Sequence, residues 1–398
     1  MSILKKKENQ FLIITIFFFI FYLFNPELFW KITITPFIDS DVINKQSGEL
    51  AIISNKFYDL RYLQYISGYF ESIKLPSDEL YNLYKQHDSE MVINYPRIWI
   101  AISHYINIKS ETVLYSFYFL FFILYTNIFF QIIKKTNSYF ICYLFFCGAN
   151  LLLLERGNVD LLLITLVFYT FLNKNKFLNY FGFLLVSFLK IYPAFSLFFF
   201  LKDKKSIKVM LLISTIFFIY LLITKNDIIN ISLVNPKNGN SSYGFLSIII
   251  NFKNYFNINL EYFYIIIINL FIIFVVYYFL LKKKLNSVRF KDTKIFLLGG
   301  GIFIFTFLIN THHDYRMMFL IFCSPLILNI ENKYFKMLSL ILIILSLEIQ
   351  KLIFIFGFWG GAINSMAKLI LFYIITIIYI DIINQLIKKI FIPVQTLR

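Results

Sequence analysis

Five short polar motifs interrupt the apolar stretches of this chain of 398 residues. They are FIDSD (37–41), NYPR (94–97), ERGNVD (155–160), LKIYP (189–193) and THHDYR (311–316). They place carboxylates, cations, phenols and imidazoles directly beside apolar segments. Ionisable groups at such positions usually face a cavity or one another, so these motifs are the candidates for a functional site.

The cations of the motifs could bind an anion. They are Arg97, Arg156, Lys190 and Arg316, with His312 and His313 beside them, and the acids are Asp39, Asp41, Glu155, Asp160 and Asp314. Cations among apolar walls suit a phosphate carried on a lipid, and a carboxylate in the same pocket could act as a general base. These groups suffice for glycosyl transfer from a lipid phosphate. That reaction needs one base for the acceptor hydroxyl rather than the paired acid and base of glycoside hydrolysis.

The composition indicates a membrane protein. Hydrophobic residues make up 59% of the chain, more than the roughly half expected of a soluble domain. Runs such as FLIITIFFFIFYLF (11–24) and FYIIIINLFIIFVVYYFL (263–280) are expected to cross a bilayer, and we interpret the first as a retained anchor. The net charge of +16 comes from lysines in short loops between apolar runs, which fits membrane orientation and not nucleic acid binding. The three cysteines lie inside apolar runs, which indicates packing rather than disulfides or a metal site.

The basic clusters predict how the chain crosses the membrane. They lie at 5–7, 134–135, 174–176, 202–205, 282–294, 333–336 and 388–398. If all are cytoplasmic, an even number of crossings separates each from the next, which gives about twelve crossings with both termini inside. We therefore expect a single all-α domain, 1–398, in the cytoplasmic (inner) membrane, with all five polar motifs and the active site at the outer face.

Short helical hairpins are expected to present three of the motifs. ERGNVD joins the arms 139–154 and 158–172, and THHDYR joins 294–310 and 315–329. Residues 177–201 could be one crossing, but the charge pattern favours two short arms divided by LKIYP. A last pair, 336–356 and 366–387, is expected to leave GFWGGAINS (357–365) as an outer turn. Residues 31–110 form the large outer loop, in which 96–108 is an interfacial helix lying on the membrane.

The motifs resemble glycosyltransferase family 87. NYPRIW, ERGNVDLLL, LKIYP and HDYRMMFLIFCSPLIL follow one another in the family's order, although Arg156 stands near the glycine where glutamine is more usual. The resemblance implies a GT-C-like bundle with membrane-lying helices in the first outer loop and no cofactor. It also implies transfer outside the cytoplasm from a polyprenyl-phosphate sugar to a lipid-linked glycan or glycolipid acceptor, usually with inversion. Asp39 or Asp41 would then be the general base, and the motif leaves open which.

The remaining residues receive roles in two groups. We expect Arg156, Asn158, Lys190, His313 and Arg316 to contact the donor phosphate, and Tyr95, Arg97, Glu155, Asp160, Tyr192, Asp314 and Tyr315 to shape the pocket. Each has a structural alternative: Asp39, Asp41 and Asn158 could cap helices, and Lys190 could extend from a helix end to the interface. Adjacent histidines without matched partners do not make a metal site.

Two other functions remain open from the sequence. A polysaccharide polymerase joining lipid-linked repeat units would have similar outer cations, but it fits the motif order less well. A lipid-linked glycan flippase or other transporter belongs to a different class. It should show internal repeats and broken helices that meet within the membrane, and no repeat is visible.

Overall fold

The protein is described by a computed structural model, which covers residues 6–24, 58–80, 82, 96–201, 203–234, 242–256, 261–275, 292–309 and 312–391. These residues are helical, apart from turns and one pair of short strands. Strands β1 (Ser242–Tyr243) and β2 (His312–His313) pair antiparallel, with Ser242 opposite His313.

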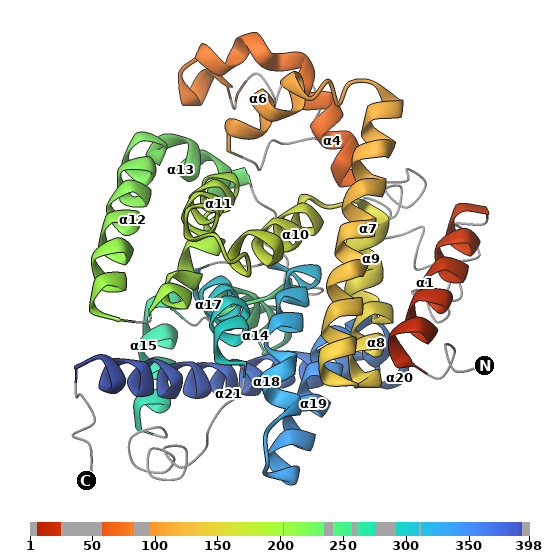
Figure 1. The fold of residues 1–398 in the computed structure, drawn as a ribbon, viewed down its shortest axis with the longest axis vertical. Helices are drawn as coiled ribbons and strands as arrows, with labels where there is room; N and C mark the ends of the chain where they lie inside the picture. The colour runs from red at the N-terminus through yellow and green to blue at the C-terminus, as the bar shows by residue number, and fades with distance from the viewer. Residues whose placement is uncertain are drawn as a thin grey trace.

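Within the described residues, three helices are long and apolar enough to cross a membrane. They are α7 (Glu111–Thr136), α12 (Lys204–Ile223) and α21 (Phe358–Phe391). In Figure 1, α7 and α12 run along the long axis of the molecule, and α21 passes crosswise beneath them. Four shorter apolar helices are α10 (Val159–Phe171), α11 (Lys176–Leu189), α15 (Tyr262–Val275) and α17 (Thr293–Ile309). The described chain is thus helical and compatible with membrane insertion, while the number of twelve crossings stays a prediction.

The remaining elements are short helices. In the first half of the chain they are α1 (Lys7–Phe24), α4 (Tyr58–Ile66), the 3₁₀ helix η3 (Ser67–Lys74), α6 (Ile98–Tyr105), α8 (Tyr139–Phe146), α9 (Gly148–Arg156) and the 3₁₀ helix η4 (Tyr192–Phe200). In the second half they are α13 (Lys225–Val234), α14 (Phe245–Phe256), the 3₁₀ helix η6 (Asp314–Phe322), α18 (Ser324–Leu328), α19 (Lys333–Leu347) and α20 (Ile349–Phe356). The large outer loop predicted at 31–110 therefore contains helices α4, η3 and α6 in its described part.

Asparagine side chains start several helices. The side-chain oxygens of Asn158, Asn175 and Asn332 accept backbone N–H groups at the first turns of α10, α11 and α19. Helix α12 begins with a capping box in which Asp203 and Ser206 exchange hydrogen bonds. Each cap satisfies a donor that the helix itself leaves unpaired, so the polar residues between apolar runs define where the helices begin.

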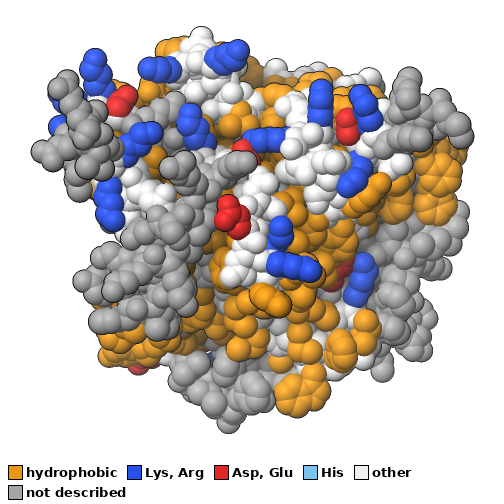
Figure 2. Space-filling view, turned by 60° about the horizontal axis from the view of Figure 1, so that its bottom comes forward, with side chains coloured by type: hydrophobic (Ala, Val, Ile, Leu, Met, Phe, Trp, Pro, Cys, Tyr) orange, Lys and Arg blue, Asp and Glu red, His pale blue; other side chains and the backbone are white. Residues whose placement is uncertain are grey.

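The lysine-rich helix ends lie together. Lys7 Nζ donates to Asn137 O at 2.8 Å, where α1 meets the end of α7. Lys135 pairs with Asp292, and Asn329 also donates to Asp292, at 3.3 Å. Figure 2 turns the lower side of the molecule forward and shows Lys and Arg side chains spread over it beside broad hydrophobic areas. The start of α1, the end of α7 and the start of α17 thus lie near one another; that all basic clusters share one side of a membrane stays a prediction.

The structure differs from the predicted hairpins in three places. The expected arm 139–154 is broken at Cys147, and the expected arm 336–356 is broken at Glu348. The segment expected as an outer turn, 357–365, belongs to α21 apart from Gly357, which alone makes the turn with φ of +55°. A single left-handed glycine suffices there because it adopts positive φ without steric cost.

Three consecutive glycines bring α17 against three other helices. A Cβ on Gly299 would lie 2.5 Å from Phe319 O of η6, and one on Gly301 would lie 2.6 Å from Phe195 O of η4. A Cβ on Gly300 would meet side chains alone, the Tyr379 ring of α21 at 3.2 Å and the Phe296 and Ile375 side chains at 3.4 and 3.5 Å. Because η4 and η6 approach α17 backbone to backbone, residues 299 and 301 must lack a side chain.

These contacts predict a graded response to alanine. Gly299→Ala and Gly301→Ala should each lower the free energy of unfolding by about 1–3 kcal/mol, the usual range for overpacking. Gly300→Ala is the matched control and should change it less, because a ring can shift where a backbone carbonyl cannot. Thermal unfolding of the purified variants in detergent measures this order. Equal midpoints for the three variants would contradict the packing.

Candidate functional site

Three of the polar motifs meet at one buried carboxylate. Asp160, which is 0% exposed, lies in the first turn of α10. Its Oδ1 accepts a hydrogen bond from Lys190 Nζ at 2.6 Å and another from the Tyr192 hydroxyl. Its Oδ2 accepts from Arg316 Nε at 3.0 Å. ERGNVD, LKIYP and THHDYR thus contribute to a single group of four side chains, the Asp160 cluster.

The ERGNVD turn places Asp160 through backbone geometry. Helix α9 ends at Arg156, and Gly157 follows in the left-handed region with φ of 58°. The N–H groups of Gly157 and Asn158 return to the carbonyls of Leu154 and Leu153, at 3.2 and 3.3 Å. Asn158 Oδ1 then accepts the N–H of Asp160 at 2.9 Å. This glycine C-cap followed directly by an asparagine N-cap starts α10 with Asp160 facing the interior.

The LKIYP break places Lys190 in a comparable way. The last carbonyls of α11 have no partners within the helix, and side chains from two other helices supply them. Tyr220 of α12 donates to Phe188 O, and Trp99 of α6 donates to Leu189 O, both at 2.9 Å. Lys190 then takes an extended conformation, with φ of −151° and ψ of 138°. With α11 ended in this way, the Lys190 side chain reaches Asp160.

The cluster holds two cations next to each other by means of one acid. The Lys190 side chain is 8% exposed and that of Arg316 is 16% exposed. Each cation also lies 5.8 Å from the centre of the Tyr192 ring. Asp160 therefore fixes both cations beside one another.

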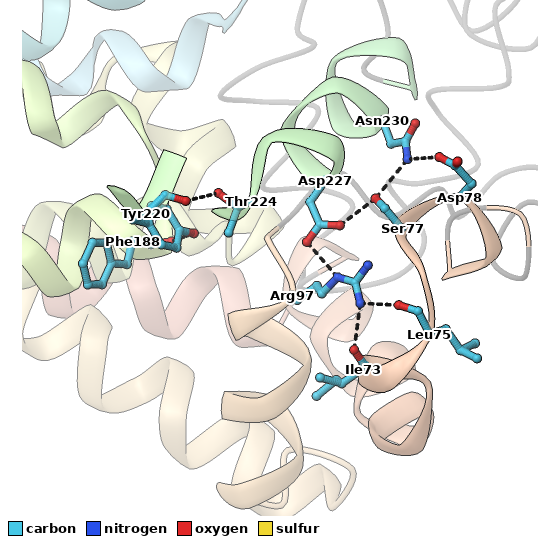
Figure 3. A network of polar contacts seen from close by, with 10 residues as sticks. All are labelled: Ile73, Leu75, Ser77, Asp78, Arg97, Phe188, Tyr220, Thr224, Asp227 and Asn230. Carbon is cyan, nitrogen blue, oxygen red and sulfur yellow. Dashed lines mark hydrogen bonds and ion pairs between the residues drawn. The ribbon is translucent and has the colours of Figure 1, made fainter. Parts of the chain in front are cut away.

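Arg97 belongs to a different network (Figure 3). Its Nε donates to Asp227 of α13 at 2.7 Å, and one terminal nitrogen donates to the carbonyls of Ile73 and Leu75 at 2.7 and 2.6 Å. Asp227 also accepts from Ser77 at 2.6 Å. Arg97, expected at the rim of the pocket, thus ties the end of η3 to α13 in the structure.

Helix α6 connects this network to the Asp160 cluster. Trp99, two residues after Arg97, is fully buried and holds the end of α11 through Leu189. The same Trp99 lines a small, mainly apolar crevice with Gly157 and Asn158 of the ERGNVD turn. The described part of residues 31–110 therefore packs over the two turns from which Asp160 and Lys190 extend.

The other predicted site residues are placed as follows. Asp39, Asp41 and Tyr95 lie outside the described residues, and of Glu155, His313, Asp314 and Tyr315 only the backbone is described. Arg156 is partly buried at the end of α9, and the side-chain oxygen of Asn158 serves as a helix cap. Their contact with a donor stays a prediction. Within the described residues, no group of three His, Cys, Asp or Glu side chains could hold a metal ion.

A second buried acid was not identified from the sequence. Glu348, with a side chain 8% exposed, accepts from the Tyr143 hydroxyl at 2.9 Å and from the N–H of Gly148 at 3.3 Å. Lys351 Nζ lies 3.0 Å from the same carboxylate. Glu348 thus joins the breaks between α8 and α9 and between α19 and α20. Its signal, an acid within the apolar run LSLEIQKLIF, is of the same kind as that of ERGNVD.

Comparison with known proteins gives no match among protein-family models, curated proteins or solved structures. The family resemblance accordingly rests on the motifs themselves.

The burial of Asp160 predicts a large effect of its removal. Asp160→Asn leaves Lys190 and Arg316 without their shared carboxylate, and breaking a buried pair in this way costs about 3–5 kcal/mol of folding free energy. Glu111→Gln is the control, because Glu111 and Arg61 form an exposed pair at 3.6 Å that should be worth at most about 1 kcal/mol. Chemical unfolding of both variants in detergent measures the difference. If both variants lose a comparable amount of folding free energy, the interactions of Asp160 do not stabilise the fold more than an exposed ion pair does.

Proposed function

We propose that the chain is a membrane glycosyltransferase with a GT-C-like fold. It would transfer a sugar from a polyprenyl-phosphate donor to a lipid-linked glycan or glycolipid at the outer face of the cytoplasmic membrane. The observation that carries the proposal is the Asp160 cluster, in which motifs spaced over more than 150 residues supply two cations to one buried place. The order of those motifs, which resembles family 87, supports the same reaction class.

In the proposed mechanism the cluster binds the donor phosphate. Lys190 and Arg316 stabilise the charge that develops on the phosphate as the bond between the sugar's anomeric carbon and the phosphate oxygen breaks. The electron pair of this bond stays on the phosphate. Preorganised cations in a water-poor site are effective because they need not reorient during the reaction. Asp160 holds them in place, and because its oxygens already accept from three side chains, it is a positioning residue and not the base.

The acceptor is activated by a separate carboxylate. Its hydroxyl oxygen forms the new bond to the anomeric carbon while its proton passes to the general base. Asp39 or Asp41 is the proposed base, on the family resemblance. Attack opposite the departing phosphate inverts the anomeric centre.

A reconstituted assay tests the transferase. Purified protein is supplied with a panel of polyprenyl-phosphate hexoses and candidate lipid-linked acceptors. Lys190→Met and Arg316→Met should each lower kcat by about 10²–10³-fold, as removal of one charge-stabilising donor does. Lys135→Met is the control, since Lys135 pairs with Asp292 at the lysine-rich side, and it should retain transfer.

The base is tested in the same assay. One of Asp39→Asn and Asp41→Asn should lower kcat by about 10²–10⁴-fold, the contribution of a positioned base, and the other should not. If both variants keep full turnover, neither aspartate is the base. If the unaltered protein transfers no sugar from any donor of the panel, the transferase proposal fails.

One observation favours the transporter alternative. Two broken helices meet at Glu348, which accepts the first N–H of α9 beside Tyr143 and Lys351. Discontinuous helices around a buried charge are typical of secondary transporters. A lipid-linked glycan flippase is therefore the second candidate function.

Glu348→Gln separates the two candidates. In proteoliposomes with a fluorescent lipid-linked glycan, a flippase should move the lipid between leaflets, and this variant should slow the movement. A transferase should show no such movement, and Glu348→Gln should then lower thermal stability while leaving kcat unchanged.

A further inference from the structure

A polar groove lies in the described part of residues 31–110, apart from the Asp160 cluster. It has a volume of about 260 Å³ and is lined by Ser67, Gly68, Phe70, Glu71, His104, Asn107 and Lys109. The His104 ring stacks on Phe70, with ring centroids 4.0 Å apart and an interplanar angle of 11°. The Tyr105 ring, which is 76% exposed, lies edge-on to Phe70 at 5.2 Å. One wall of the groove is thus aromatic, and the remainder carries hydrogen-bonding groups.

Hydrogen bonds between neighbouring segments fix the conformation of the groove. Gln64 Nε2 of α4 donates to Lys109 O at 2.7 Å, and Ser67 Oγ donates to Gln64 O at 2.6 Å. Asn107 turns the chain after α6 in the left-handed conformation, with φ of 57°, which asparagine tolerates better than most residues. The lining residues therefore come from three segments that are fastened to one another.

The chemistry of the lining indicates the class of ligand. Among the lining residues, Glu71 and Lys109 carry opposite charges, so the groove does not select a strongly charged ligand. A flat ring pair offers an apolar face, and the carboxylate, amide, hydroxyl and ammonium groups offer donors and acceptors. Sugar rings present the matching surfaces, an apolar face of C–H groups and a rim of hydroxyls.

Helix α6 links the groove to the proposed reaction centre. Trp99 of the same helix α6 contacts Leu189, next to Lys190. An α-helix rises about 1.5 Å per residue, which places His104 about 7.5 Å along α6 from Trp99. We propose that this groove binds the uncharged glycan of the acceptor and directs its growing end along α6 toward the Asp160 cluster. The acceptor role rests on the proposed transferase, whereas the binding of glycan does not.

Binding is tested without turnover. Protein in phosphatidylcholine nanodiscs, free of sugar-headed detergent, is mixed with cellotetraose, maltotetraose or chitotetraose, and saturation-transfer NMR records contact with the sugar protons. At least one oligosaccharide should give a signal, and His104→Ala or Glu71→Gln should reduce it. Both residues are exposed, so the fold is retained.

Tyr334→Ala is the matched control, an 87% exposed aromatic residue of α19, and should leave the signal unchanged. No signal with any of the three sugars, a signal that survives both groove variants, or an equal loss in the control overturns the proposal.

Turnover tests the acceptor role. In the transfer assay, His104→Ala should raise the KM for a glycan acceptor by about five- to tenfold, the value of one aromatic contact, while the KM for the donor stays constant. If the groove binds glycan but His104→Ala leaves the acceptor KM unchanged, the groove is a glycan site and its role as the acceptor site is rejected. Glycan binding with no transfer by the unaltered protein would retain the groove and reject the transferase.

Discussion

The candidate site depends on the neutralisation of a buried carboxylate. Asp160 is completely enclosed, and an ionised carboxylate in an apolar interior is tolerated only when opposite charges and hydrogen bonds surround it. Lys190 and Arg316 meet that need from two other segments of the chain. The cations need the acid in turn, because neither Lys190 nor Arg316 would be stable in an apolar interior without a negatively charged partner. A site with two adjacent cations is therefore also a condition for folding.

Backbone packing makes this convergence possible. Tyr192 and Arg316 lie on the 3₁₀ helices η4 and η6, and both helices press against α17 where Gly299 and Gly301 have no side chains. On the opposite side, Trp99 and Tyr220 complete the hydrogen bonds of the α11 terminus just before Lys190. The positions of the polar groups thus follow from glycine contacts and helix caps that carry no charge themselves.

The sequence predicts the breaks of this fold better than its contacts. ERGNVD, LKIYP and THHDYR each interrupt a helical stretch as their glycine, proline and polar residues indicate. However, four cations and five acids among the motifs allow many pairings, and only helix packing selects Lys190 and Arg316 for Asp160. Arg97 illustrates this limit, because its chemistry suits a pocket rim and yet it binds Asp227. The glycine triplet 299–301 and the acid Glu348 in an apolar run can both be seen in the sequence. Their structural roles, however, depend on contacts with residues far along the chain.

The coupling between Asp160 and Arg316 is the most direct measure of the central claim, that distant motifs form one site. A double-mutant cycle compares the free energies of unfolding of Asp160→Asn, Arg316→Gln and the double variant in detergent. Residues in direct contact should show an interaction energy within the usual range of about 0.5–3 kcal/mol. Losses that add to within about 0.3–0.5 kcal/mol would show that the two residues are independent and contradict the cluster.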